Sequence, residues 1–302
     1  MKNAFLITIA LFYSLFTFAQ PGVSIDEVNK TIVGGTTERN VYKMLIHQAK
    51  KQDVLKGLKK RLEKGTKTKV IVDKSNVLIE RVVYKDYWSD SLVLNVEVVE
   101  VELGTVCFFA IDLDTVAISS VTHPELNVKV KRYMKSFGLD MYDQAVNEEM
   151  EREEKHLKSI EKDLKSALHE NDKITQKIHN EKMSINDLSD EVSMNEADRG
   201  SKIAEIQVQK DRVNESNDIE KDAEKEKLKV LKVDLKKIKK TNKKLNKEIF
   251  KKENNIRDME IDIEKNVQLQ ESVHNRMTEQ NAVVEEVRKK QFAISDAKKS
   301  MD

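Results

Sequence analysis

The residue types that most often carry catalysis are present in this chain but lack the spacing that catalysis requires. Asp112 and Asp114 flank Leu113 at the end of an apolar run and could hold a cation, but turn formation is the simpler explanation. No GxxxxGK[ST] phosphate-binding motif occurs. The histidines form no i, i+4 pair, no HExxH motif and no cluster with acidic partners at ligand spacing; they are His47, His123, His156, His169, His179 and His274. We therefore predict no catalytic residue, no cofactor-binding residue, no metal site and no enzyme activity.

Cys107 is the only cysteine, and it lies in the apolar run 106–111. A single thiol cannot form an internal disulfide. We expect Cys107 to be a small residue of the hydrophobic core. The alternative is a disulfide between two copies of the chain.

One stretch has a chemically distinctive charge. Residues 225–252 contain thirteen lysines and three acidic residues, although the net charge of the whole chain is only +1. Such a basic helix attracts anionic polymers such as nucleic acid or polysaccharide. The simpler interpretation is a solvated helix face, because we see no interleaved aromatic residues and no base-reading arginines.

The N-terminus has the pattern of an export signal. Lys2 precedes the apolar run 4–18, and Thr17-Phe18-Ala19 form a small-residue cleavage site before Gln20. We predict a signal peptide at 1–19 and a periplasmic or extracellular mature chain. The alternative is an uncleaved membrane anchor, but the run is short for a span of about 20 residues. We expect no transmembrane segment in the mature chain.

Residues 20–140 indicate a small α+β domain. Apolar residues at helical spacing predict one or two helices between 36 and 64, and alternating runs predict antiparallel strands at 69–72, 77–84, 92–102 and 105–113. Leu103-Gly104 is the expected hairpin turn. Thr122-His123-Pro124-Glu125 has the pattern of a capping box that starts a closing helix. Gly138 is the expected hinge into the rest of the chain.

A long internal repeat follows this domain. Residues 153–220 recur at 224–291 with an offset of 71 and no gap, and polar exceptions such as Asn171 and Asn242 recur with the apolar positions. Both copies have apolar residues at positions a and d of a heptad, with a at Leu157 in the first copy and at Leu228 in the second. Heptads sustained over this length predict a coiled coil, which we place at 143–297.

The offset favours an antiparallel helical hairpin. Because 71 is ten heptads plus one residue, the two heptad frames are out of step between Val213 and Leu228. Folding the arms back pairs Asn171 with Asn266 and Asn195 with Asn242, and it sets the lysine-rich stretch against the more acidic residues 185–212. The prediction is arm one at 143–213, a tip at 214–223 and arm two at 224–297.

Other arrangements remain open at this stage. Asn217, with Glu220 three residues later, is the expected cap of arm two, whereas Gly200 is a competing bend. The main rival is one continuous parallel coiled coil, in which Asn171 and Asn242 pair with their own copies in a dimer. Some apolar residues fall outside the seam, either as scattered exposed residues or as a second seam of a homodimer of hairpins; they are Met183, Val208, Val230, Val233, Phe250 and Ile261.

Several motifs together resemble a known group of proteins. Thr122-His123-Pro124-Glu125, the segment 131–138, Glu153-Glu154-Lys155-His156-Leu157 and the segment 283–290 resemble an uncharacterised family of exported Bacteroidota proteins. The resemblance implies a small α/β domain, a Lys/Glu-rich helical tail and a location outside the cytoplasm, and it supplies no site residues. The tail of this chain is longer by one repeat.

These patterns define two expected functions. The first is a non-enzymatic structural or interaction protein of the cell envelope, in which the coiled coil is a spacer or an oligomerisation rod and the α+β domain binds an envelope protein. The alternative is a basic coiled-coil rod that binds an anionic polymer.

Overall fold

The computed structural model describes residues 22–32, 38–66, 69–83, 88–217 and 219–301. The expected signal peptide therefore lies outside the described residues. The chain divides into two compact units. One comprises Met1–Leu157 with Glu279–Asp302, and we call it the sheet unit. The other comprises Lys158–Thr278, and we call it the arm unit.

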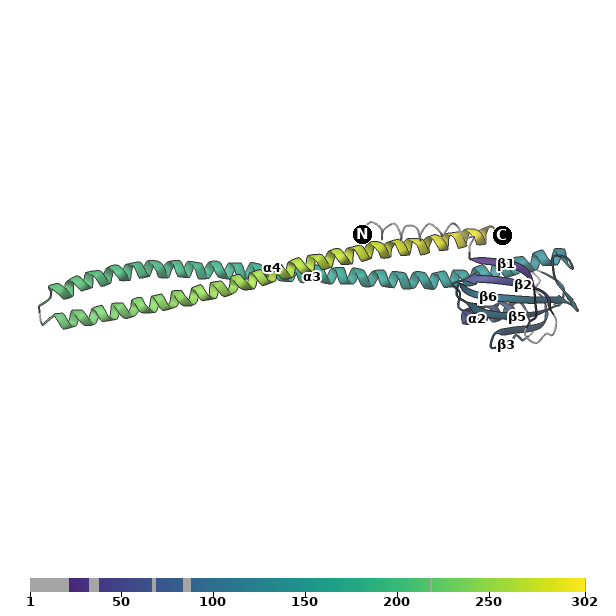
Figure 1. Cartoon of the computed structure of the whole chain (residues 1–302), viewed down its shortest axis with the longest axis horizontal. Coiled ribbons are helices and arrows are strands. Elements are labelled where there is room, and N and C mark those ends of the chain that lie inside the picture. Colours follow the sequence, from purple (N-terminus) through teal and green to yellow (C-terminus); the bar gives the residue numbers. More distant parts are fainter. Residues whose placement is uncertain (1–21, 33–37, 67–68, 84–87, 218, 302) are drawn as a thin grey trace, which may run out of the picture. The chain divides into compact units, whose positions relative to one another are not determined.

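An antiparallel sheet forms the centre of the sheet unit (Figure 1). Its strand order is β1-β2-β6-β5-β4-β3, and β7 pairs with β6. β5 alternates buried and half-buried residues along most of its length, as a strand with one covered face requires. The elements are β1 (Val23–Lys30), β2 (Arg39–His47), α2 (Lys51–Gly65), β3 (Ile71–Asp73), β4 (Asn76–Val82), β5 (Leu92–Val101), β6 (Gly104–Leu113), β7 (Val116–Ala117), α3 (Pro124–Glu215) and α4 (Lys221–Lys299).

The sequence prediction missed the first part of this sheet. The region predicted to be helical from residue 36 onward contains strand β2, and only α2 is helical there. Val41, Met44 and Leu45 fit a helical period, but β2 pairs with β1 on one side and β6 on the other, so alternate residues from Tyr42 to Ile46 enter the core. The strands β1 and β7 were not predicted. The hairpin turn lies one residue earlier than expected, at Glu102-Leu103, because Val101 pairs with Gly104, the first residue of β6. Gly104 has φ +143°, which favours glycine.

The closing helix and the first arm are one continuous helix, α3. Gly138 is therefore not a hinge. A Cβ at Gly138 would lie 2.6 Å from Val23 Cγ1, so the missing side chain allows α3 to pack closely on the sheet. The Thr122 hydroxyl also differs from its expected capping role: it accepts the Ser119 N–H and donates to the Ala117 carbonyl, which holds the loop before α3.

The last part of α4 completes the core of the sheet unit. Val284, Val287 and Ile294 belong to the same buried cluster as Tyr142 and Val146 of α3 and the inner face of the sheet. Polar contacts flank this packing: Lys290 Nζ lies 2.9 Å from Glu149, and Lys298 Nζ lies 2.8 Å from Asp143. The compact sheet unit thus includes residues on both sides of the predicted boundary at 140.

The arm unit is an antiparallel helical pair formed by parts of α3 and α4 (Figure 1). Glu196 of α3 accepts a hydrogen bond from Asn242 of α4 at 2.7 Å, and Glu181 accepts one from Lys252 at 2.7 Å. Glu181 is earlier in α3 and Lys252 is later in α4, so the two helices run antiparallel. Every buried residue described in this unit is at an a or d position: Ile160, Ala167, Ile178, Ile206, Gln209, Asn242, Leu245, Ile256 and Val273. The predicted seam is therefore the buried seam, and the rival parallel coiled coil is wrong.

The turn between the long helices lies after Glu215 and before Lys221. Asn217 Oδ1 accepts the backbone N–H groups of Ile219 at 3.2 Å and Glu220 at 3.1 Å, so Asn217 caps α4 as expected. Gly200 lies within α3 and is not a bend.

The asparagine layers are less regular than the sequence suggests. Asn242 lies beside Glu196, the residue after its expected partner Asn195, so the register agrees closely with the predicted one. However, Nδ2 of Asn195 and Oδ1 of both Asn171 and Asn242 have no hydrogen-bond partner in the described chain. Asn266 Oδ1 accepts from Gln270 of its own helix. Among the described residues, the seam therefore contains these amides without the predicted Asn–Asn hydrogen bonds.

Candidate interaction surface

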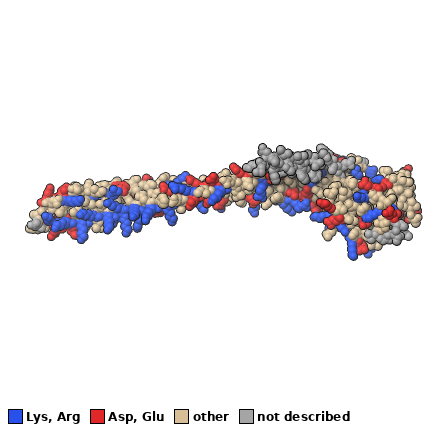
Figure 2. Space-filling model, in the orientation of Figure 1, with Lys and Arg blue, Asp and Glu red and all other residues tan. Residues whose placement is uncertain are grey.

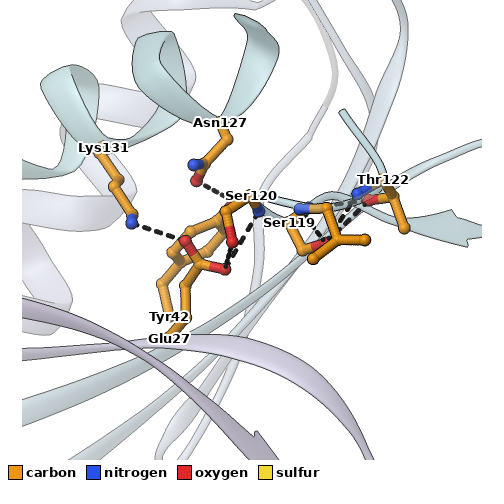
Figure 3. A network of polar contacts seen from close by, with 8 residues as sticks. Glu27, Tyr42, Ser119, Ser120, Thr122, Asn127 and Lys131 are labelled. Carbon is orange, nitrogen blue, oxygen red and sulfur yellow. Dashed lines mark hydrogen bonds and ion pairs between the residues drawn. The ribbon is translucent and has the colours of Figure 1, made fainter. Parts of the chain in front are cut away.

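The most connected polar cluster of the sheet unit surrounds Glu27 of β1 (Figure 3). Its carboxylate accepts the N–H of Ser120 at 3.1 Å and the hydroxyl of Ser120 at 2.9 Å, and it lies 2.6 Å from Lys131 Nζ. Burial alone would raise the pKa of Glu27, but the hydrogen bonds from Lys131 and Ser120 outweigh burial and hold this pKa below its usual value. The cluster joins β1, the loop before α3 and α3 itself.

A second part of this cluster is buried beside the first. The Tyr42 hydroxyl donates to Asn127 Oδ1 at 2.8 Å, and burial, assisted by the negative charge of Glu27, raises the pKa of Tyr42. A neutral phenol and a carboxylate already occupied by donors offer neither a base nor a nucleophile to a substrate. The Glu27 cluster is therefore a structural link.

Asp112 and Asp114, which the sequence offered as a cation site, have different surroundings. Both carboxylate oxygens of Asp112 lie 2.5 Å from Arg39 Nη2. Asp114 occupies a turn with φ 56°. Cys107 is fully buried, which confirms it as a core residue, and burial raises the pKa of its thiol. Within the described ranges, no group of three or more His, Cys, Asp or Glu residues is arranged to hold a metal ion. No helix in those ranges has the length and apolar character to cross a membrane.

The strongest surface feature of the arm unit is a row of lysines on α4. Figure 2 shows basic side chains gathered along one edge of the helical pair, in the part that contains the turn. Five of these lysines recur at steps of three or four residues and so share one face of α4. We call them the lysine stripe: Lys232, Lys236, Lys239, Lys243 and Lys247.

The lysine stripe is not neutralised by its neighbours. Five other lysines of the stretch have acidic partners: Lys225, Lys227, Lys229 and Lys237 pair with a residue one helical turn away, and Lys252 pairs with Glu181 across the seam. The stripe lysines are all exposed, and none of them has a described carboxylate within 4.0 Å. The acidic residues of the stretch 185–212, which were expected to face the lysines, are therefore too few or too distant to compensate the positive charge of the stripe.

A groove runs beside the stripe, and we call it the stripe groove. It has a volume of about 500 Å³ and is lined by Glu196 and Arg199 of α3 and by Lys239, Asn242, Lys243, Asn246, Lys247 and Phe250 of α4. Phe250 is 61% exposed. The expectation that no aromatic residue lies among the lysines is wrong. The turn of the helix brings Phe250 to the same side as Lys239, Lys243 and Lys247. The position of Phe250 in the helical period could have predicted this placement.

The sheet unit has a basic groove of its own. It lies between α2 and α3, has a volume of about 420 Å³, and includes Lys56, Lys60 and Lys64. Arg61 in this groove is already bound to Asp140 at 2.8 Å and to Ser136 at 2.9 Å. Phe137, the aromatic residue in its lining, is 1% exposed, whereas Phe250 of the stripe groove is 61% exposed.

The apolar residues outside the seam are exposed. Met183, Val208 and Val230 are between 52% and 53% exposed. Exposure agrees with both expectations, scattered surface residues and a second seam between two hairpins, so the second seam stays a prediction.

The chain matches no family model, no curated protein and no solved structure.

Proposed function

We propose that this protein is a non-enzymatic exported interaction protein of the cell envelope. In this proposal the antiparallel coiled coil is a spacer that presents a binding surface, and the sheet unit holds the two ends of the hairpin together. The N-terminal sequence pattern supports export, and the motifs shared with exported proteins of the Bacteroidota support the same location.

One observation carries the proposal. Throughout the arm unit, the residues that are buried are those of the a and d seam, so this part of the chain is a two-helix structure whose side chains otherwise face outward. Such a structure provides length and surface rather than an enclosed site.

Two measurements test the proposal. Cell fractionation with N-terminal sequencing is expected to find the chain outside the cytoplasm and beginning at Gln20. Small-angle scattering with light scattering on residues 20–302 is expected to give an elongated particle. A cytoplasmic chain that keeps its first residues would contradict export, and a globular particle would contradict a spacer.

The second candidate function is binding of an anionic polymer by the arm unit. The exposed lysine stripe without nearby carboxylates favours it specifically, because an uncompensated row of cations concentrates polyanions. Retention of residues 20–302 on an acidic polymer matrix is expected to fall steeply with salt. Absence of retention at low salt would exclude this candidate.

A further inference from the structure

We propose that the stripe groove of the arm unit binds single-stranded nucleic acid. This inference deepens the second candidate function and rests on it, because it names the class of polyanion and the side chains that recognise it. Two features of the groove carry it: a row of cations and an exposed aromatic ring.

The cations form a single file suited to one strand. Lys239, Lys243 and Lys247 line the groove at steps of four residues, so their Cα atoms are about 6 Å apart along the helix axis. Lys232 and Lys236 extend the file toward the turn. A single file follows the phosphates of one strand and does not require a second strand.

The groove also contains one acidic side chain. Glu196 lies 2.6 Å from Arg199 Nη1 and accepts from Asn242, so its charge is already engaged by groups of the protein. Four cationic residues line the groove against this one carboxylate. The groove therefore keeps a positive excess for phosphates.

The exposed aromatic ring distinguishes a nucleic acid from other polyanions. Phe250 is three residues beyond Lys247, lines the same groove and is 61% exposed. Proteins that bind single strands combine a basic groove with aromatic side chains on which bases stack. Polyphosphate and acidic polysaccharides have no aromatic base to stack on Phe250. In a duplex the bases are already stacked on each other, which favours a single strand.

The buried amide adds a polar group at the groove. Asn242 is 5% exposed; its Nδ2 donates to Glu196 at 2.7 Å, while its Oδ1 has no partner among the described residues. Buried amide oxygens normally accept a hydrogen bond. Because Asn242 Oδ1 is itself buried, it is closed to a ligand, and the role of this amide is to position Glu196 at the groove.

The test is binding of a fluorescently labelled oligothymidylate of about 20 nucleotides to residues 20–302, followed by fluorescence anisotropy at several salt concentrations. The triple substitution Lys239→Gln, Lys243→Gln and Lys247→Gln is expected to weaken binding about tenfold or more at low salt. It is also expected to reduce the salt slope by about 2, because three phosphate contacts on a single strand are lost.

A matched control separates the groove from the general field of α4. Lys240→Gln, Lys244→Gln and Lys251→Gln remove the same charge from the same helix but leave the lining of the groove intact. This control is expected to weaken binding clearly less. Equal losses in the two triple variants would overturn the assignment of the groove.

A second variant separates nucleic acid from other polyanions. Phe250→Leu keeps an apolar residue but removes the ring, so binding of oligothymidylate is expected to weaken about fivefold or more, with no change for an abasic strand of the same length. Because Phe250 is exposed, the variant is expected to keep the circular dichroism spectrum of the parent.

The remaining outcomes are distinguishable. Unchanged oligothymidylate binding by Phe250→Leu, or equal binding of the abasic strand, would overturn the nucleic-acid inference and leave polyanion binding standing. No binding of oligothymidylate, polyphosphate or a sulfated polysaccharide at low salt would overturn both the inference and the second candidate function. The proposed spacer function would then depend on the scattering and fractionation results alone.

Discussion

Glu27 shows how one carboxylate joins three elements of the sheet unit. Its side chain is 16% exposed and receives hydrogen bonds from Ser120 and Lys131, so β1 is tied to the loop before α3 and to α3 (Figure 3). Hydrogen bonds to a charged group contribute more than neutral ones, and they are lost when that group is protonated. The stability of the sheet unit should therefore depend on the protonation of Glu27.

Glu27→Gln is expected to lower the free energy of unfolding of the sheet unit by roughly 1 to 2 kcal/mol at neutral pH. The pKa of Glu27 in the folded chain is below the ordinary value of 4.5. The contribution is thus complete above pH 4.5 and decreases as the pH falls through the lower, folded-state pKa. Urea unfolding at a series of pH values measures it, with the fluorescence of the buried Trp88 as the reporter.

Glu102→Gln is the control for this prediction, because Glu102 lies exposed in the turn between β5 and β6. Its difference from the parent should be small at every pH. A Glu27→Gln variant whose deficit persists unchanged at pH values well below 4.5 would show that the ionised carboxylate is not the stabilising species.

Single residues were predictable where one local property decides their place. Cys107 lies in an apolar run and is buried, and Asn217 has the cap chemistry that the turn uses. Thr122 fits a capping box equally well in sequence, but the loop from Ala117 to Ser119 takes its hydroxyl instead. The stripe groove needed both the helical phase of Phe250 and the position of Arg199 on the other helix, which no local pattern contains.

At the scale of elements, the two glycines of α3 have opposite surroundings. Gly138 packs against the sheet, where an added Cβ would lie 2.6 Å from Val23 Cγ1 and 3.0 Å from Met44 Sδ. At Gly200 an added Cβ would meet nothing within 4 Å. The same substitution should therefore have opposite effects at the two positions.

Gly200→Ala is expected to stabilise the arm unit by about 1 kcal/mol, because alanine loses less backbone entropy in a helix. Gly138→Ala gains the same helical preference but must displace Val23, and we expect a net destabilisation of about 1 to 3 kcal/mol. Thermal unfolding followed by circular dichroism compares the two variants. A stabilised Gly138→Ala variant would mean that the sheet readily moves away from α3.

The seam asparagines with unsatisfied amide atoms suggest a second substitution at this scale. Asn195→Leu with Asn242→Leu removes buried amide atoms that lack partners, so the arm unit is expected to melt at a higher temperature. Polar residues at seam positions also restrict register and oligomeric state. Light scattering is therefore expected to find additional oligomers in the double variant, and a purely monomeric, less stable variant would contradict both parts.

The elements differ in how far their sequences define them. The strand β5 and the long helices have a sustained period, and β6 is a nearly continuous apolar run, so their types were predictable. The apolar residues of β2 fit two periods, and its pairing with β1 and β6 decides between them. The boundary between domain and coiled coil could not be located because α3 passes through it without a change of structure.

For the molecule as a whole, the decisive feature is that the two arms of the hairpin belong to one chain. Lys182 of α3 lies 4.0 Å from Glu260 of α4, and both side chains are exposed. Cysteines at these positions should therefore be joined by a short bismaleimide within a single chain. The native Cys107 does not interfere, because it is fully buried.

The double variant Lys182→Cys with Glu260→Cys is expected to give a cross-linked monomer that migrates faster in a denaturing gel. The control, Lys182→Cys with Lys237→Cys, moves the second thiol 23 residues along α4, which is about 35 Å. It should give no cross-link. Cross-linked dimers of the first variant would mean that arms pair between chains.

The packing of Val284, Val287 and Ile294 against the sheet also sets an order of events in folding. Residues 142–150 contribute to the same core but leave the ribosome much earlier, so the sheet unit cannot close until the final turns of α4 have been made. Zipping of the helices from their turn is a local process, whereas direct closure of so long a loop is an entropic search. The hairpin therefore provides the route by which the end of the chain returns to its beginning.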